Sequence, residues 1–179
     1  LATREPSAEL GDLMSTEVLL RPVEPADLTT VLAMNNEAVP AVNHLDAGDL
    51  SWFSGVAHTF LVACRAETGR HAGFLIGLEG PGLAYRSDNY RWFSERYEHF
   101  IYVDRVVVAP NDWGTGIGRA LYTEFVSAAD RHPVLCAEVN LLPRNDRSLA
   151  FHEAFGFVPV GEQDTEGGSK RVQMLVLEL

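Results

Sequence analysis

The spacing of apolar and polar positions predicts strands and helices along nearly the whole chain. Residues 100–108 (FIYVDRVVV) form an almost continuous β-branched and aromatic run, which is typical of a central strand buried on both faces. Apolar residues then recur at helical spacing over 117–129, and a polar stretch ending in Pro133 stops that helix. A further helix over 146–155 ends at Gly156, a residue suited to a left-handed C-cap.

The other predicted elements complete one alternating series. They are a strand over 18–22, a helix over 24–37, a short helix over 46–56, strands over 59–65 and 72–78, an irregular aromatic segment over 80–98, a strand over 134–141, and final strands over 157–160 and 170–177. No repeat or linker divides the series. The order predicts a single α/β domain, with a mixed central sheet of about seven strands flanked by about four helices.

Length and cysteine content fit a self-sufficient domain. The 179 residues can bury a core without metal or disulfide, and Cys64 and Cys136 lie in apolar runs, as buried free thiols do in a reducing compartment. No apolar run reaches the roughly 20 residues that span a bilayer, and we expect a cytoplasmic protein. Residues 1–14 are interpreted as a disordered segment before the domain over 15–179, in which residues 1–13 are a leader or vector-derived segment and Met14 is the native start.

The charge and the histidine spacing narrow the function classes. A formal net charge of −11, from 14 basic and 25 acidic residues, argues against nucleic acid or an anionic membrane as the main partner. An acidic surface attracts cations instead, amines among them. The histidines lack metal-site spacing, so no metal is expected, and no Gly-x-Ser-x-Gly sequence supports a serine hydrolase.

The segment 111–119 (NDWGTGIGR) joins the central strand to the following helix. Its alternating glycines Gly114, Gly116 and Gly118 let backbone N–H groups converge and a ligand approach closely, and the helix N-terminus adds positive potential. The loop lacks the Gly-Lys-Ser/Thr of a Walker A motif, and Arg119 stands where a dinucleotide fingerprint needs its third glycine. A phosphate cradle and a simple tight turn both fit, and three glycines favour the cradle.

Three segments resemble the GNAT superfamily of acyl-CoA-dependent N-acetyltransferases: Val106–Pro110, Trp113–Leu121, and Asn145 with Phe151–Phe157. The glycine loop is similar to motif A, Gln/Arg-x-x-Gly-x-Gly/Ala, and the last segment to motif B, Asn-x-x-Ala/Ser-x-x-Leu/Phe-Tyr-x-x-x-Gly-Phe. The resemblance covers about residues 99–160. It implies transfer of an acetyl group from acetyl-CoA to a primary amine, by direct attack in a ternary complex.

The resemblance also implies a set of cofactor-binding residues along the strand, the loop and the last helix. They are Val106, Val107, Val108, Trp113, Gly114, Thr115, Gly116, Ile117, Gly118, Arg119, Asn145, Ser148 and Phe151. Trp113 departs from the family's Gln or Arg, and Arg119 either replaces that charge or is a solvated helix residue. His152 stands where the family most often has Tyr, so the usual leaving-group acid is missing by type.

Two residues are candidates for the chemistry. Asp104 lies inside the buried strand, where burial favours a basic role, and regular alternation puts it on the face of Tyr102 and Val106. The alternative for Asp104 is an ion pair or a structural hydrogen bond, although a regular strand points Arg105 to the opposite face. His152 either protonates the leaving thiolate or only hydrogen-bonds the cofactor arm.

The acceptor site is predicted from aromatic residues and one further carboxylate. Tyr90 and Trp92 either form an amine pocket through cation–π contacts or belong to a packed lid. Tyr102 is a reserve acid, and Glu138 either faces the acceptor or bonds the sheet edge. We expect a small-molecule amine. The alternatives are a silent acyl-CoA-binding or sensing domain, another acyl donor, or an O-acceptor; family members often dimerise, but this sequence shows no interface signal.

Overall fold

The computed structural model describes residues 17–179, so the predictions for residues 1–14 and Met14 lie outside the described residues. One seven-stranded sheet runs through the molecule in the order β1-β2-β3-β4-β5-β7-β6. The strands are β1 (Val18–Pro22), β2 (Thr59–Arg65), β3 (His71–Gly80), β4 (Phe100–Val108), β5 (Val134–Leu142), β6 (Val158–Thr165) and β7 (Lys170–Glu178). β4 and β5 are parallel, and the other neighbours are antiparallel. The predicted mixed sheet in one α/β domain is confirmed.

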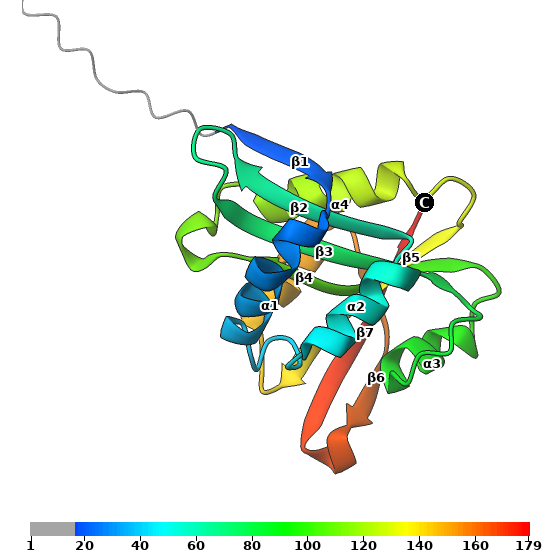
Figure 1. Ribbon diagram of the computed structural model, residues 1–179. Coiled ribbons are helices and arrows are strands. Elements are labelled where there is room, and N and C mark those ends of the chain that lie inside the picture. The colour runs from blue at the N-terminus through cyan, green and yellow to red at the C-terminus, as the bar shows by residue number, and fades with distance from the viewer. Residues whose placement is uncertain (1–16) are drawn as a thin grey trace, which may run out of the picture.

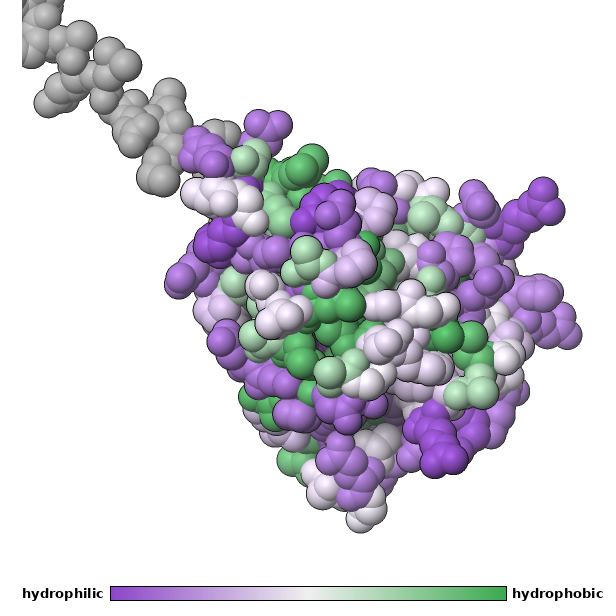
Figure 2. Space-filling model, viewed as in Figure 1, coloured by the Kyte–Doolittle hydropathy of each residue, from purple (hydrophilic) through white to green (hydrophobic). Residues whose placement is uncertain are grey.

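Five α-helices cover the two faces of the sheet (Figure 1). They are α1 (Leu28–Glu37), α2 (Ala47–Val56), α3 (Asp88–Ser94), α4 (Ile117–Ser127) and α5 (Asp146–Phe155). Buried side chains of α1, α2 and α3 pack on one face, and those of α4 and α5 pack on the other. In the same view, Figure 2 shows hydrophilic residues around the rim and apolar residues in the middle. The apolar residues lie where α1 and α2 cover the buried core on that face of the sheet. No described helix is long and apolar enough to cross a membrane.

Two predicted elements need correction. The segment 80–98 was expected to be irregular, yet it contains α3, which begins after Ser87 because the Ser87 Oγ accepts a hydrogen bond from the Tyr90 N–H at 3.2 Å. β6 extends to Thr165 where only 157–160 was predicted. Its second half is polar because β6 is an edge strand that pairs only with β7, so it carries little of the apolar signal that marks buried strands.

A β-bulge interrupts β4 at Asp104. The β3 register passes from Arg105, opposite Ile76, to Val103, opposite Gly77, so Asp104 has no partner residue. Val106 therefore packs with the core under α4, whereas Tyr102 packs with the core under α1 and α2. The prediction that Asp104 shares a face with both Tyr102 and Val106 is wrong, because the extra residue reverses the alternation after it.

β4 and β5 separate soon after they begin. Their parallel register is limited to two residue pairs, Ile101 with Leu135 and Tyr102 with Cys136. Beyond these pairs, residues of both strands line the same cleft. The divergence therefore opens the middle of the sheet at the carboxyl ends of two parallel strands. The two cysteines, Cys64 and Cys136, are buried free thiols as predicted.

Candidate functional site

A large cleft follows the opening between β4 and β5. Its volume is about 1040 Å³, and its lining comes from segments far apart in sequence. One part, here called the loop end, is formed by most of the residues in the segments 106–119 and 145–152. The other part, the glutamate end, is formed by Tyr85, Asn89, Tyr102, Asp104 and Glu138 together with the α1–α2 loop and the β6–β7 hairpin.

At the loop end, the backbone conformation requires glycine at two positions. Gly114 and Gly116 have φ of +76° and +87°, in the left-handed region that L side chains rarely adopt. A Cβ on either residue would meet no atom of the chain within 4 Å, so each glycine borders open space on the cleft. Gly116 is also the N-cap of α4. The loop is thus an open, amide-lined concavity of the kind that holds phosphate.

Asp112 holds the start of the glycine loop in place. Its carboxylate is buried and accepts hydrogen bonds from Arg70 Nη1 at 2.8 Å and Arg65 Nε at 2.9 Å. These hydrogen bonds lower the pKa of Asp112, that from Arg70 most strongly. The Asp112 carbonyl accepts from Thr115 Oγ1 at 2.7 Å. Thr115 therefore braces the turn and, unlike the other predicted loop residues, does not line the cleft.

Sequence reasoning missed Asp112 because its partners lie more than 40 positions away, at Arg65 and Arg70. The neighbouring Asn111 and Trp113 give no local signal for such an anchor. The predicted strand residues Val106, Val107 and Val108 and the loop residues Ile117 and Gly118 all line the cleft.

Two arginines stand near the glycine loop. Arg119 is exposed and donates from Nη2 to the Ala154 carbonyl at 3.2 Å, which ties α4 to α5. Trp113 is 48% exposed, and its indole N–H donates to the Val108 carbonyl at 2.8 Å. The Arg147 guanidinium lies over the Trp113 ring, 3.3 Å from its centroid. Both members of this stack line the cleft.

α5 brings Asn145, Ser148, Phe151 and His152 to the cleft. Asn145 Oδ1 accepts from the Ser148 N–H at 3.1 Å, so this side chain is the N-cap of the helix. The Phe151 ring lies edge-on to the Tyr122 ring, with centroids 5.2 Å apart. The N-cap fixes where α5 begins, and α5 carries these four residues along one wall of the cleft.

His152 is a buried, neutral side chain. Its Nδ1 lies 2.8 Å from the Ser148 carbonyl, which can only accept, so Nδ1 carries the proton and Nε2 accepts from the Tyr122 hydroxyl at 2.8 Å. Burial lowers the pKa of His152 to about 4. At neutral pH both nitrogens are engaged and the ring holds no second proton. The geometry therefore fits a packing and hydrogen-bonding role and does not support the predicted acid.

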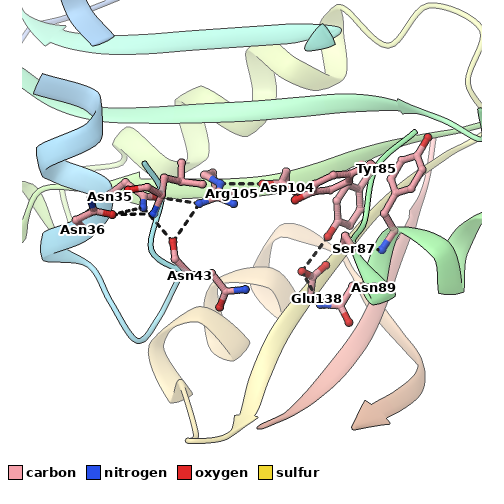
Figure 3. A network of polar contacts seen from close by, with 12 residues as sticks. Asn35, Asn36, Asn43, Tyr85, Ser87, Asn89, Asp104, Arg105 and Glu138 are labelled. Atoms are coloured by element: carbon pink, nitrogen blue, oxygen red, sulfur yellow. Dashed lines mark hydrogen bonds and ion pairs between the residues drawn. The ribbon is translucent and has the colours of Figure 1, made fainter. Parts of the chain in front are cut away.

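Glu138 is the buried carboxylate at the glutamate end (Figure 3). Its Oε1 accepts from the Tyr102 hydroxyl at 2.9 Å and from Asn89 Nδ2 at 3.0 Å, whereas Oε2 is buried without a hydrogen-bond partner among the described residues. Burial raises the pKa of Glu138 to about 7. A carboxylate with one oxygen held and the other unpartnered can accept a proton near neutral pH.

Asp104 is tied into a structural network instead. Its Oδ2 accepts from Arg105 Nε at 2.7 Å, and its Oδ1 accepts from the Tyr85 hydroxyl at 2.5 Å. Arg105 also donates to Asn35 Oδ1 at 2.9 Å and to the Asn43 carbonyl at 3.2 Å. Figure 3 shows this chain of contacts reaching from α1 to the segment before α3. In a regular strand, Asp104 and Arg105 would point to opposite faces of the sheet. The bulge at Asp104 breaks this alternation, so the two side chains form an ion pair.

The predicted aromatic acceptor residues divide into two groups. Tyr102 lines the cleft, as does Tyr85 of the aromatic segment 80–98. Tyr90 and Trp92 do not: the Tyr90 hydroxyl donates to the Glu79 carbonyl at 2.8 Å, and a Cβ on Gly161 would lie only 2.8 Å from the Trp92 ring. The prediction of an amine pocket at Tyr90 and Trp92 needs correction, because α3 turns both inward as packing. Among the described residues no group of three potential metal ligands is found.

Comparisons with known proteins agree with this geometry. The model of the acetyltransferase (GNAT) family matches residues 29–157, whereas no curated protein is significantly similar in sequence. Among solved structures, Ard1 from Thermoplasma volcanium aligns with a TM-score of 0.72 at 17% identity, over 90% of this chain and 97% of that chain. Naa20 from Chaetomium thermophilum, in complex with a bisubstrate analogue, aligns with a TM-score of 0.73 at 22% identity, over 90% and 86%. The protein yncA from Salmonella typhimurium, with its cofactor acetyl-CoA, aligns with a TM-score of 0.67 at 21% identity, over 91% and 94%.

Proposed function

The chain belongs to the GNAT acetyltransferase family, and from this premise we propose that it transfers an acetyl group from acetyl-CoA to a primary amine by direct attack in a ternary complex. The observation that carries the proposal is Glu138. A buried carboxylate with a pKa raised to about 7 and an unpartnered Oε2 lies on the cleft that also contains the glycine loop. Such a group is suited to remove a proton from an amine near neutral pH.

The loop end fits acetyl-CoA, which supplies the acetyl group as a thioester. The amides of Gly114, Gly116 and Gly118 would hold the pyrophosphate, since Gly114 and Gly116 border open space where a phosphate can approach the backbone. Beyond Tyr102 the edge of β4 that faces β5 has no strand partner among the described pairings, so 106–108 can hydrogen-bond an extended pantetheine arm. Asn145, Ser148 and Phe151 form the opposite wall of the cleft.

At the glutamate end, Glu138 acts as general base. An alkyl ammonium has a pKa of about 10.4, so a base is needed to produce the free amine at neutral pH. Tyr102 and Asn89 hold Oε1 and leave Oε2 to receive the proton. The thiol of CoA has a pKa near 8.5, so its thiolate is a fair leaving group and the reaction does not require a proton from His152. The neutral His152 then serves as a positioning residue for α5.

The acceptor in this proposal is a small cationic amine. Exposed carboxylates of Glu37, Asp88 and Glu166 line the cleft around the glutamate end, beside the cationic side chains of Arg86 and Lys170. The chain as a whole has a net charge of −11, which raises the local concentration of cations and disfavours acidic acceptors. A peptide N-terminus is the other amine class to test, because a structural neighbour, the NatC complex, is bound to Gag peptide and CoA.

The test combines cofactor binding with turnover. Calorimetric titration of acetyl-CoA into the protein should give micromolar binding, and a thiol-release assay over small amines and short peptides should identify the acceptor class. Glu138→Gln should bind acetyl-CoA as the wild type does and lose turnover, whereas the exposed helix variant Glu124→Gln should retain both. Binding without release for any amine would favour a silent acyl-CoA-binding domain, and faster turnover with another acyl-CoA would revise the donor.

A further inference from the structure

We propose that Arg147, stacked on Trp113, is the binding site for the 3′-phosphate of the CoA nucleotide. The inference rests on the proposed use of acetyl-CoA and goes beyond it, because it assigns a specific anion to a stack that the family motifs do not describe. Trp113 occupies the first loop position, where the GNAT motif has Gln or Arg, so the loop lacks a polar or cationic side chain there. Arg147 brings a cation to the same place from α5.

The stack is fixed in orientation. The Trp113 indole N–H donates to the Val108 carbonyl at 2.8 Å, which holds the ring beside the end of β4. The Arg147 guanidinium carbon is 3.3 Å from the ring centroid, a distance at which the guanidinium lies against the aromatic face. Contact through its face leaves the in-plane N–H donors of Arg147 directed away from the ring, where they can bind a phosphate in a bidentate manner.

The charge of Arg147 is not used elsewhere among the described residues. No hydrogen bond or ion pair involving its side chain is found there, whereas its neighbour Arg144 pairs with Asp146 at 2.5 Å. Arg147 is also the second residue of α5, where the helix dipole disfavours a cation. An unpaired arginine in this unfavourable position, exposed and lining the cleft, is explained if it meets an anionic ligand.

The position of the stack distinguishes the two kinds of phosphate on CoA. The glycine amides lie after Trp113 in the loop, so the pyrophosphate has its own donors. Trp113 precedes the glycines in the loop, and both Trp113 and Arg147 are solvent-exposed, which suits the outer, nucleotide end of the cofactor. A 3′-phosphomonoester carries close to two negative charges at neutral pH, and a net charge of −11 makes a local cation more important for holding it.

The test is the affinity of the intact protein for CoA and for 3′-dephospho-CoA, measured by calorimetry. We expect Arg147→Ala to weaken CoA binding about tenfold, as loss of a charge-assisted hydrogen bond does, and 3′-dephospho-CoA binding less than about twofold. The CoA affinity of Arg147→Lys should lie between those of the wild type and Arg147→Ala, because lysine keeps the charge and loses the bidentate geometry of arginine. Trp113→Gln should also reduce the preference for CoA. Arg144→Ala, whose side chain is paired outside the cleft, is the matched control and should leave both affinities unchanged.

Each other outcome overturns the proposal in a recognisable way. Equal weakening of both ligands by Arg147→Ala would place the arginine at the pyrophosphate, and no weakening would remove it from the site. If the wild-type protein binds neither ligand, the proposed acetyltransferase function fails as well. Thermal melting of each variant shows whether it is folded, and quenching of indole fluorescence by CoA in the wild type but not in Trp113→Phe gives a readout independent of activity.

Discussion

The loop end and the glutamate end of the cleft are built in different ways. The loop end comes from two continuous stretches, 106–119 and 145–152, in which the backbone and neighbouring side chains form the surface. The glutamate end is assembled from α1, the segment before α3, β4, β5 and the last hairpin. Its chemistry depends on contacts such as Asn35 to Arg105, across 70 positions. A site made from contiguous residues leaves a motif in the sequence, and a site assembled from distant ones does not.

The two ends also differ in electrostatics. The loop end offers amide donors and an unpaired arginine, and it is open to solvent at Trp113 and Arg147. The glutamate end buries carboxylates, one of which, Asp104, is neutralised by Arg105, while the other, Glu138, has no cationic hydrogen-bond or ion-pair partner within residues 17–179. An anion and an amine are therefore expected at opposite ends of one cleft. The predictions below test this division.

The largest effect is expected for Glu138→Gln. Removal of a general base typically lowers turnover about 10²- to 10⁴-fold, and acetyl-CoA affinity should stay near that of the wild type because the loop end is untouched. The wild-type turnover should rise with pH through about 7, the pKa of Glu138, because the deprotonated carboxylate is the active form. A pH–rate profile of the two proteins checks both points, and an unchanged rate in the variant would exclude Glu138 as base.

The same variant has a stability signature with a definite sign. The pKa of Glu138 is raised in the folded protein, so between about pH 4 and 7 the folded state binds more protons than the unfolded state. The free energy of unfolding should therefore fall as pH rises through that window. Glu138→Gln removes the titrating group, so its denaturant midpoint should fall less steeply with pH. Parallel pH dependences in variant and wild type would contradict the buried environment described here.

Asp104→Asn separates a base from a structural carboxylate. The Asp104–Arg105 pair is buried, and breaking such a pair typically costs about 3 to 5 kcal/mol because the remaining charge stays buried without compensation. We expect a markedly lower melting temperature and weaker acceptor binding. The midpoint of the pH–rate profile should move to lower pH, because the charge of Asp104 contributes to the raised pKa of Glu138. If the variant melts like the wild type and loses its pH dependence instead, Asp104 is the base after all.

Gly116→Val tests the loop end. Its φ of +87° disfavours any β-branched residue, by about 1–2 kcal/mol, and the new side chain extends into the space above the loop. Calorimetry should show acetyl-CoA binding weakened more than about tenfold, since the side chain blocks the proposed phosphate contact. Gly167→Val is the matched control, because Gly167 has a φ of +68° but lies in the β6–β7 turn outside the cleft lining. Equal losses in both variants would attribute the effect to backbone strain.

The smallest effect is expected for Asn89→Leu. Asn89 donates to Glu138 Oε1, and this hydrogen bond lowers the pKa of the carboxyl group. Its loss should raise that pKa and move the rise in turnover to higher pH, with a maximal rate within a few-fold of the wild type. Asn36→Leu removes an α1 side-chain amide that hydrogen-bonds Leu45 in the α1–α2 loop, on the far side of the network, and should leave the midpoint in place. A downward shift for Asn89→Leu would contradict the donor assignment.

The fold and most residues of the loop end could be predicted from the sequence. The apolar run 100–108 and the glycine spacing are local features, so they predicted the central strand and the cradle directly. The prediction that Asp104 shares a face with Tyr102 and Val106 was wrong because it assumed regular alternation, and the bulge that breaks the alternation is set by pairing with β3. The anchor Asp112 and the inward turn of Tyr90 and Trp92 also depend on tertiary contacts, which a single sequence does not display.

The short pairing of β4 with β5 has a consequence for how the protein opens. With only two residue pairs joining them, the sheet consists of two hydrogen-bonded blocks, β1 to β4 and β5 to β7, held together by the side chains that cross between them. Amide hydrogens along 106–108 and on the facing edge of β5 are expected to exchange with solvent fastest among the central strands in the free protein. A bound pantetheine arm would cover the gap between β4 and β5 and slow this exchange. The ligand would then act as an eighth strand that stabilises the whole sheet.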